Sequence, residues 1–221
     1  MWRTLHNYPV YSPPFRDAEA VLSKSEIAAN FKYFLEQKER RVGYLTTYLS
    51  QFSLALRLER EGLFAVDDWL RRFSGYLVPR RDALYAFVEH EPEWNCGYLG
   101  LNVINDVAIF AGDYIISKNK NVRWDVYYGD GTKYDYEECG FGLPCLFGLL
   151  NAEYRGRPYS IQHEIFQCCS SGRYRLIHGG IGGVWDIPGE LVRQLDYLTD
   201  PNPPAQGRFR LSIPGHNRHK L

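Results

Sequence analysis

The 221-residue sequence lacks three features that would assign it to a protein class at once: an excess of charge of one sign, a long hydrophobic run and a regular cysteine pattern. Its 26 basic and 26 acidic residues balance, so no net field favours nucleic acid or a membrane surface as a partner. No apolar run reaches the length of a transmembrane helix, and the opening residues lack the apolar centre of a signal peptide. We therefore expect a cytoplasmic protein.

The five cysteines do not show the paired spacing of a zinc site. Cys96, Cys139 and Cys145 stand alone, whereas Cys168 and Cys169 are adjacent and would point to opposite faces of a strand. We therefore expect free, mostly buried thiols, with neither a metal site nor another cofactor.

The clearest pattern is a helix over residues 99–118 that is followed by a strand. Apolar residues recur at spacings of three and four through the helix, at Leu101, Ile104, Ala108, Ala111 and Ile115. From Val122 the period changes to two, which predicts a strand with one face on the core. Asp106 and Asp113 lie near one face of the helix, and Gly112 would let another backbone approach. A binding site there stays open, but we favour a solvated helix edge because carboxylates are usually exposed.

The first hundred residues are predicted to be helical after an extended arm over residues 1–22, which contains several prolines and aromatic residues. Ser23 or Ser25 can cap a long helix that reaches Gly62, or bends or divides near Gly43. Its apolar stripe over 28–56 packs within the chain or, alternatively, forms a homodimer; it comprises Phe31, Leu35, Val42, Leu45, Leu49, Phe52 and Leu56, with Lys38 as its one break.

Two further helices are predicted in this half, over 66–77 and over 80–90. A basic cluster falls on them, made of Arg71, Arg72, Arg80 and Arg81. Acidic residues stand among these arginines, at Asp67, Asp68 and Asp82. We therefore favour salt bridges within the chain over an anion or RNA site.

The region over 122–185 is predicted to be rich in β-structure because it is punctuated by glycine. We expect a hairpin in which residues 159–169 and 173–178 flank Ser170–Gly172. A final helix over 188–198, capped by Asp186, turns Leu191, Leu195 and Leu198 inward. The whole is an α+β domain over 1–200, with a helical N-terminal layer packed on a mainly antiparallel C-terminal sheet. The proline-rich tail over 201–221 is expected to be flexible.

Candidate catalytic groups are few. His163, Cys168 and His178 fall on the predicted hairpin, where a cysteine and a histidine on neighbouring strands can form a thiolate nucleophile. His163 and Cys168 are five residues apart, however, so on a regular strand they point to opposite faces. An enzyme, such as a hydrolase or a nucleotide-processing enzyme, is therefore the alternative interpretation and not the favoured one.

An acidic, tyrosine-rich segment over 125–138 is the better candidate for a functional surface. A solvated loop between strands, with some of its tyrosines in the core, is the alternative interpretation of the same residues. Tyrosine offers a large contact area at small entropic cost, and clustered carboxylates steer a basic partner. The residues that we predict to bind a partner are Asp125, Tyr127, Tyr128, Asp130, Tyr134, Asp135, Tyr136, Glu137 and Glu138.

Three stretches of the chain resemble uncharacterised bacterial α+β families, several of which are similar to immunity proteins of toxin and secretion systems. They are NFKYFLEQKERRVGYL, GLNVINDVAIFAGDYIISKNKNVRW and FGLPCLFGL, within residues 25–150. The sharpest part is Gly112-Asp113 followed by Trp124, where the related sequences often carry Gly-Glu. The resemblance implies a bacterial, cytoplasmic toxin inhibitor that acts by stoichiometric binding of a cognate protein toxin, without catalysis.

Overall fold

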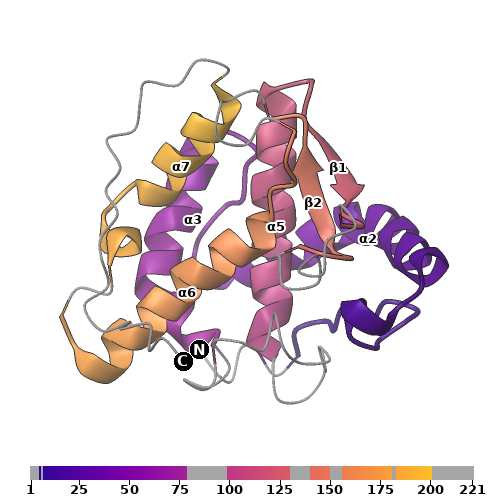
Figure 1. Ribbon diagram of the computed structural model, residues 1–221. Helices are drawn as coiled ribbons and strands as arrows, with labels where there is room; N and C mark the ends of the chain where they lie inside the picture. The colour runs from indigo at the N-terminus through magenta and orange to yellow at the C-terminus, as the bar shows by residue number, and fades with distance from the viewer. Residues whose placement is uncertain are drawn as a thin grey trace, which may run out of the picture.

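The computed structural model describes residues 5, 7–78, 99–129, 140–149, 156–180 and 183–200. Within them the chain forms five α-helices and one two-stranded antiparallel sheet, so it is an α+β protein that is mostly helical (Figure 1). The helices are α2 (Lys24–Ser50), α3 (Arg60–Phe73), α5 (Leu99–Lys118), α6 (Ile161–His178) and α7 (Glu190–Thr199). The strands are β1 (Arg123–Val126) and β2 (Pro144–Phe147), and short 3-10 turns lie at Glu19–Val21, Ser74–Tyr76 and Val184–Asp186.

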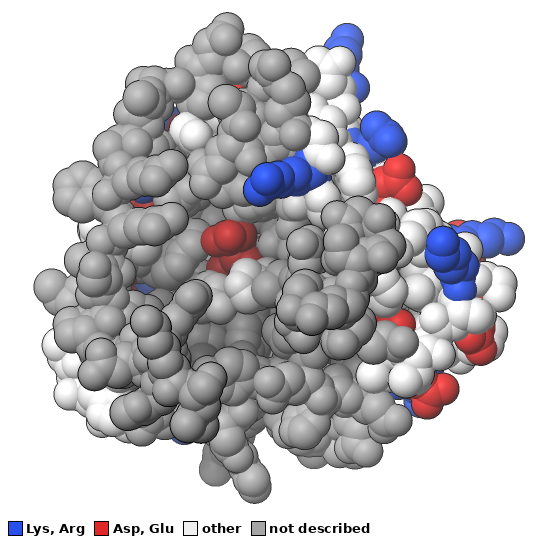
Figure 2. All heavy atoms as spheres, in the orientation of Figure 1, with Lys and Arg blue, Asp and Glu red and all other residues white. Residues whose placement is uncertain are grey.

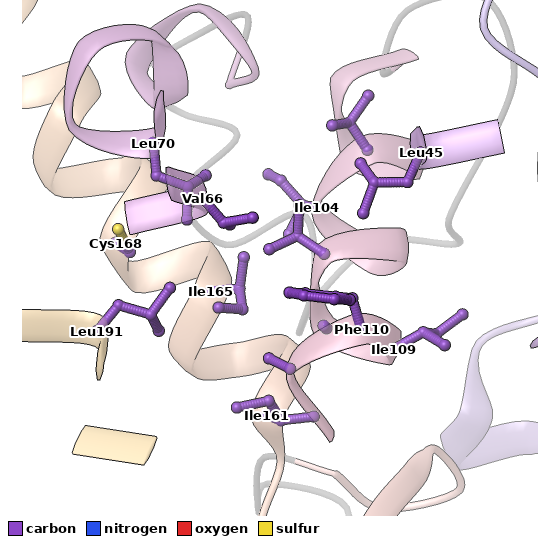
Figure 3. Packing of buried hydrophobic residues seen from close by; sticks show 14 of the residues in the cluster. Leu45, Val66, Leu70, Ile104, Ile109, Phe110, Ile161, Ile165, Cys168 and Leu191 are labelled. Carbon is purple, nitrogen blue, oxygen red and sulfur yellow. The ribbon is translucent and has the colours of Figure 1, made fainter. Parts of the chain in front are cut away.

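Helix α5 is the centre of the fold, with α2, α6 and α7 packed around it (Figure 1). Fifteen of its twenty residues are buried, which is why its sequence is apolar on every side and not only along one stripe. Its length and composition alone would allow it to cross a membrane, but the core helix of a folded domain has the same properties, and 83% of its most apolar window is buried. Figure 3 shows the side chains of Ile104, Ile109 and Phe110 from this helix in the core, where Ile165 of α6 also lies.

The predicted change from helix to strand after α5 is confirmed. Strand β1 alternates between buried Trp124 and Val126 and the outward Arg123, and it pairs with β2 in the register Trp124↔Leu146. Gly112 allows a close approach, as expected, but the group that approaches is a side chain: a Cβ at this position would lie 2.2 Å from Cζ2 of Trp124. The helix and the strand are thereby locked together.

The hairpin predicted over 159–178 is wrong, because residues 161–178 form helix α6. Ser160 caps it by accepting a hydrogen bond from the His163 backbone NH at 3.3 Å. Gly172 of the Ser170–Gly172 triplet does not make a turn but a close helix contact, since a Cβ on it would lie 2.3 Å from the Ser74 Oγ. Small residues that allow close packing in a helix were mistaken for a turn. The described part of the C-terminal half therefore holds far less sheet than expected.

The long helix predicted to reach Gly62 ends at Ser50, where the chain turns through Ser53 with a positive φ of 59°. Its start is as predicted: Ser23 caps α2, and Glu26 completes a capping box. The predicted stripe is right in part: Leu45 and Leu49 are buried, but Leu35 is 45% exposed. Arg41, which the stripe did not include, is buried. The buried residues of α2 are Ile27, Phe34, Arg41, Leu45, Tyr48 and Leu49.

Helix α7 is confirmed with Leu191, Leu195 and Leu198 buried, but Asp186 does not cap it. Asp186 instead pairs with Arg175, and the first turn of α7 is capped from α3: Asp67 accepts hydrogen bonds from the Gly189 NH at 2.8 Å and the Leu191 NH at 3.0 Å. Of the expected salt bridges in the basic cluster, Arg72 pairs with Asp68 at 2.7 Å. Arg80, Arg81, the predicted helix over 80–90 and the tail over 201–221 lie outside the described residues.

Candidate functional site

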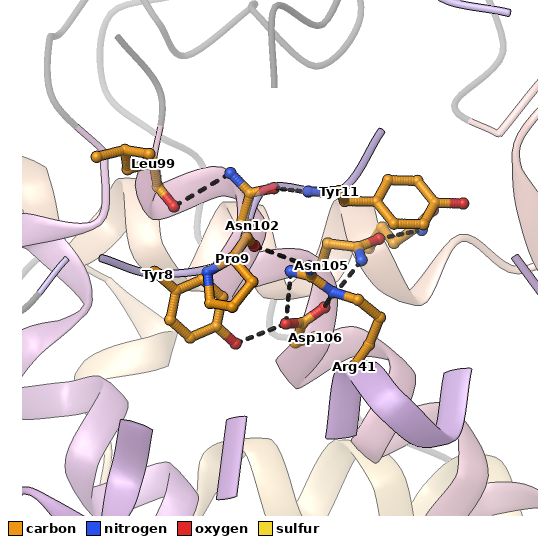
Figure 4. Close-up of polar contacts among 9 residues, drawn as sticks. Tyr8, Pro9, Tyr11, Arg41, Leu99, Asn102, Asn105 and Asp106 are labelled. Atoms are coloured by element: carbon orange, nitrogen blue, oxygen red, sulfur yellow. Dashed lines mark hydrogen bonds and ion pairs between the residues drawn. The ribbon is translucent and has the colours of Figure 1, made fainter. Parts of the chain in front are cut away.

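A buried polar network joins α5, α2 and the N-terminal arm around Asp106 (Figure 4). The side chain of Asp106 has no exposed area. One oxygen accepts from Arg41 Nε at 2.8 Å and from Asn105 Nδ2 at 3.1 Å. The other accepts from the Tyr8 hydroxyl at 2.5 Å and forms an ion pair with Arg41 Nη2 at 2.8 Å. The expectation of a solvated helix edge is therefore wrong for Asp106.

The network fixes the N-terminal arm to the body of the protein. Arg41 donates from Nη1 to the Pro9 carbonyl at 2.7 Å, and the Tyr11 NH donates to Asn102 Oδ1 at 2.7 Å. Tyr8 and Tyr11 are both buried, and the guanidinium of Arg41 lies within 6 Å of both ring centroids, at 5.7 and 5.8 Å. The described part of the predicted arm is thus anchored in the core through Tyr8 and Tyr11.

Ion pairing and burial shift the pKa of the Asp106 carboxyl in opposite directions. Burial raises its pKa to about 6, while Arg41, Tyr8 and Asn105 lower it. The carboxylate is therefore ionised at neutral pH, and it compensates the buried guanidinium of Arg41.

The network continues from Asn105 to α6 and ends at a small cavity. Gln162 Nε2 donates to Asn105 Oδ1 at 3.0 Å, and both amides line a cavity of about 40 Å³. Its other walls come from the arm, the first turns of α2 and the chain just before β2. Elements that are distant in sequence thus meet around the side-chain amides of Asn105 and Gln162. This cavity is therefore the first candidate site.

Asp113 lies elsewhere on α5, next to a second and larger hollow. It pairs with Lys38 and accepts from the Trp124 indole NH at 2.8 Å. Lys38, the break in the predicted stripe, is therefore the partner of this carboxylate. Both residues border a groove of about 400 Å³ with apolar sides formed by Val42, Leu56, Leu58 and Phe110. The homodimer through the 28–56 stripe stays a prediction.

The predicted partner-binding segment begins at the end of β1. Asp125 pairs with Arg123 at 3.2 Å, and Tyr127 and Tyr128 are half-buried. The remaining predicted contact residues lie outside the described residues: Asp130, Tyr134, Asp135, Tyr136, Glu137 and Glu138.

The described residues on either side of 130–139 come together beside the cavity. The Gly142 NH donates to the Tyr127 carbonyl at 2.8 Å, and Tyr127 and Phe141 form a parallel bridge. Gly142 also lines the cavity. The candidate surface chosen from the sequence and the cavity found in the structure are therefore neighbours.

The cysteine and histidine candidates for catalysis do not converge. His163, Cys168 and His178 all lie on α6 and not on paired strands. Ten residues separate Cys168 from His178, which is about 15 Å along a helix axis. Burial raises the pKa of Cys168 to about 12, which disfavours the thiolate. Within the described residues no group of three or more His, Cys, Asp or Glu side chains is placed to hold a metal ion.

Sequence reasoning missed Arg41, Glu19 and Gln162. Only Arg41 carried a signal: it continues the line of Ile27 and Phe34 at intervals of seven residues, so an arginine stands on the buried side of a helix. Neither Glu19 nor Gln162 belongs to a motif. Comparison of the chain with family models, with curated proteins and with solved structures gave no match.

Proposed function

We propose that this chain is a cytoplasmic binding protein that neutralises a cognate bacterial protein toxin by stoichiometric binding, and that the segment 125–138 contacts that partner. The observation that supports this best is the junction at the base of the segment. Because the Tyr127 carbonyl is bonded to the Gly142 NH, the chain leaves the sheet and returns to it at one point. The segment therefore starts beside the place where the chain rejoins the sheet.

The composition of the sequence between these two points suits a basic partner. Between Tyr127 and Gly140 the sequence holds four carboxylates and a single lysine, together with three further tyrosines. Such a concentration of one charge stands out because the chain as a whole is neutral. On the face shown in Figure 2, charged side chains of both signs are interspersed along the side occupied by α2 and β1. A local acidic surface would speed the encounter with a basic target and disfavour an acidic one.

The test is an affinity capture with the tagged full chain from the cells that produce it, followed by measurement of the affinity for the purified partner. One variant replaces Asp130, Asp135, Glu137 and Glu138 with Lys. The control variant replaces four exposed acids elsewhere, Glu36, Glu39, Glu59 and Glu61, with Lys, so its net charge changes equally. We expect binding of one partner per chain, inhibition of that partner's toxicity, and loss of both in the first variant alone. Equal binding by the two variants would exclude this segment as the contact surface, and a bound partner that stays toxic would exclude neutralisation.

A further inference from the structure

The cavity next to Tyr127 and Gly142 has room for a small polar group. Its volume of about 40 Å³ is enough for about three water-sized groups. Phe15, Phe31 and Tyr11 contribute aromatic walls, and Asp17 and Glu19 contribute carboxyl groups. The described residues that line it include no lysine, arginine or histidine. The lining is therefore acidic and aromatic, a combination that attracts cations.

The amides around the cavity leave one acceptor unused. Asn30 is occupied on both sides by the backbone of Phe15, at 3.0 and 2.8 Å. Gln162 is only 3% exposed and uses its NH₂ group on Asn105, while its Oε1 has no hydrogen-bond partner among the described residues. A buried acceptor without a partner is costly, so a ligand that donates a hydrogen bond to it would gain affinity.

Glu19 points to the same ligand chemistry. Gly142 has a positive φ of 69° and fits closely against it, since a Cβ on Gly142 would lie 2.8 Å from Cβ of Glu19. Burial raises the pKa of the Glu19 carboxyl because its charged form is desolvated. A cation in the cavity would favour the ionised form by compensating its charge.

We propose that this cavity binds the ammonium group of a lysine side chain that the protein partner inserts. This inference rests on the proposed function, because it makes the cavity the specificity pocket of that interface. The ammonium would donate hydrogen bonds to Gln162 Oε1 and to the carboxylates, and its last methylene groups would contact the aromatic walls. Gly142 lines the pocket and donates to the Tyr127 carbonyl, so the pocket lies next to the described start of the segment 125–138.

The pocket is tested first without the partner, by titrating methylammonium chloride into the isotope-labelled full chain at constant ionic strength. NMR signals of the Gln162 and Asn105 side-chain amides report on occupancy. Tetramethylammonium chloride is the matched probe, because it carries the same charge but no NH donor. We expect saturable shifts with methylammonium alone. An absence of saturable shifts, or an equal response to both probes, would overturn the proposal.

Variants of the carboxylates supply the second arm. In the Asp17→Asn/Glu19→Gln variant we expect the dissociation constant for methylammonium to rise at least about tenfold, because charged hydrogen bonds are lost. Asp68→Asn, which changes an exposed ion pair on α3, is the control and keeps the affinity of the unmodified chain. Unchanged affinity in the double variant would refute the role of the carboxylates.

The purified partner separates the two proposals. If the Asp17→Asn/Glu19→Gln variant and the four-lysine variant both lose the partner, both proposals are supported. If only the four-lysine variant loses it, the contact segment stands and the lysine pocket is wrong. If only the double variant loses it, the pocket stands and the segment is excluded as the contact surface.

Discussion

Replacing Arg41 with Met tests the energetics of the buried network directly. The side chains of Arg41 and Asp106 are only 3% and 0% exposed, and methionine fills a similar volume without a charge. The change leaves Asp106 buried without its counter-charge and also removes the bond to the Pro9 carbonyl. Breaking a buried ion pair by removing one partner costs about 3–5 kcal/mol, so we expect a loss of that size in the free energy of unfolding at pH 7.

The pH dependence of that loss identifies its cause. In the unmodified chain the pKa of Asp106 is raised from 3.8 to about 6. The stabilisation that comes from protonation of this carboxyl is therefore fully present below pH 3.8 and is lost as the pH rises through 6. Above pH 6 the free energy of unfolding no longer changes with the titration of this group. Without Arg41, which lowers this pKa, the folded-state pKa moves higher. The variant should therefore continue to lose about 1.4 kcal/mol per pH unit above pH 6.

Urea unfolding curves between pH 5 and pH 8, followed by tryptophan fluorescence, measure this slope. The double variant Arg41→Met/Asp106→Asn has no buried carboxylate, so it should lose the extra slope and regain stability at pH 8. Lys38→Met breaks the part-exposed pair with Asp113 and is the control, with an expected cost of at most about 1 kcal/mol. Equal slopes for Arg41→Met and the unmodified chain above pH 6, or a double variant less stable than Arg41→Met at pH 8, would refute this account.

Further substitutions test the packing and capping described above, each by the midpoint of urea unfolding. Gly112→Ala forces a Cβ into the Trp124 ring and should cost about 1–3 kcal/mol, whereas Gly43→Ala, in the same kind of helix but with nothing within 4 Å, should stabilise by about 0.4–1 kcal/mol. Equal effects of the two changes would rule out a steric role for Gly112. Asp67→Ala removes the acceptor that caps α7 and should cost about 1–2 kcal/mol, against at most about 0.5 kcal/mol for Asp68→Ala, and a small effect at Asp67 would contradict the capping role.

Periodicity identified the elements whose burial follows one simple pattern. Strand β1 and helix α7 could be predicted because apolar residues alone decide which face is buried. Helix α5 was found by its apolar stripe, although it also buries polar side chains such as Asn102 and Asp106. The capping box at Ser23 is equally local, since it depends on side chains three residues apart. Local rules failed at α6, because the small residues at 170–172 serve a contact with the Ser74–Tyr76 turn almost a hundred positions earlier in the chain. Nothing within the segment distinguishes that use of glycine from a turn.

The candidate site depends almost entirely on such distant contacts. Asp106 was identified on α5, but its carboxylate becomes a structural anchor only because Arg41 and Tyr8 reach it from 65 and 98 residues away. That anchor holds the arm against α5, and the arm in turn carries Glu19 to the cavity that Gln162 approaches from α6. The acidity of the segment 125–138 is visible in the sequence. The acidic pocket with an unused acceptor exists only once five separate parts of the chain have assembled. A variant that releases the arm, such as Arg41→Met, should therefore lower the affinity of the pocket for methylammonium, although the sequence of the acidic segment is unchanged.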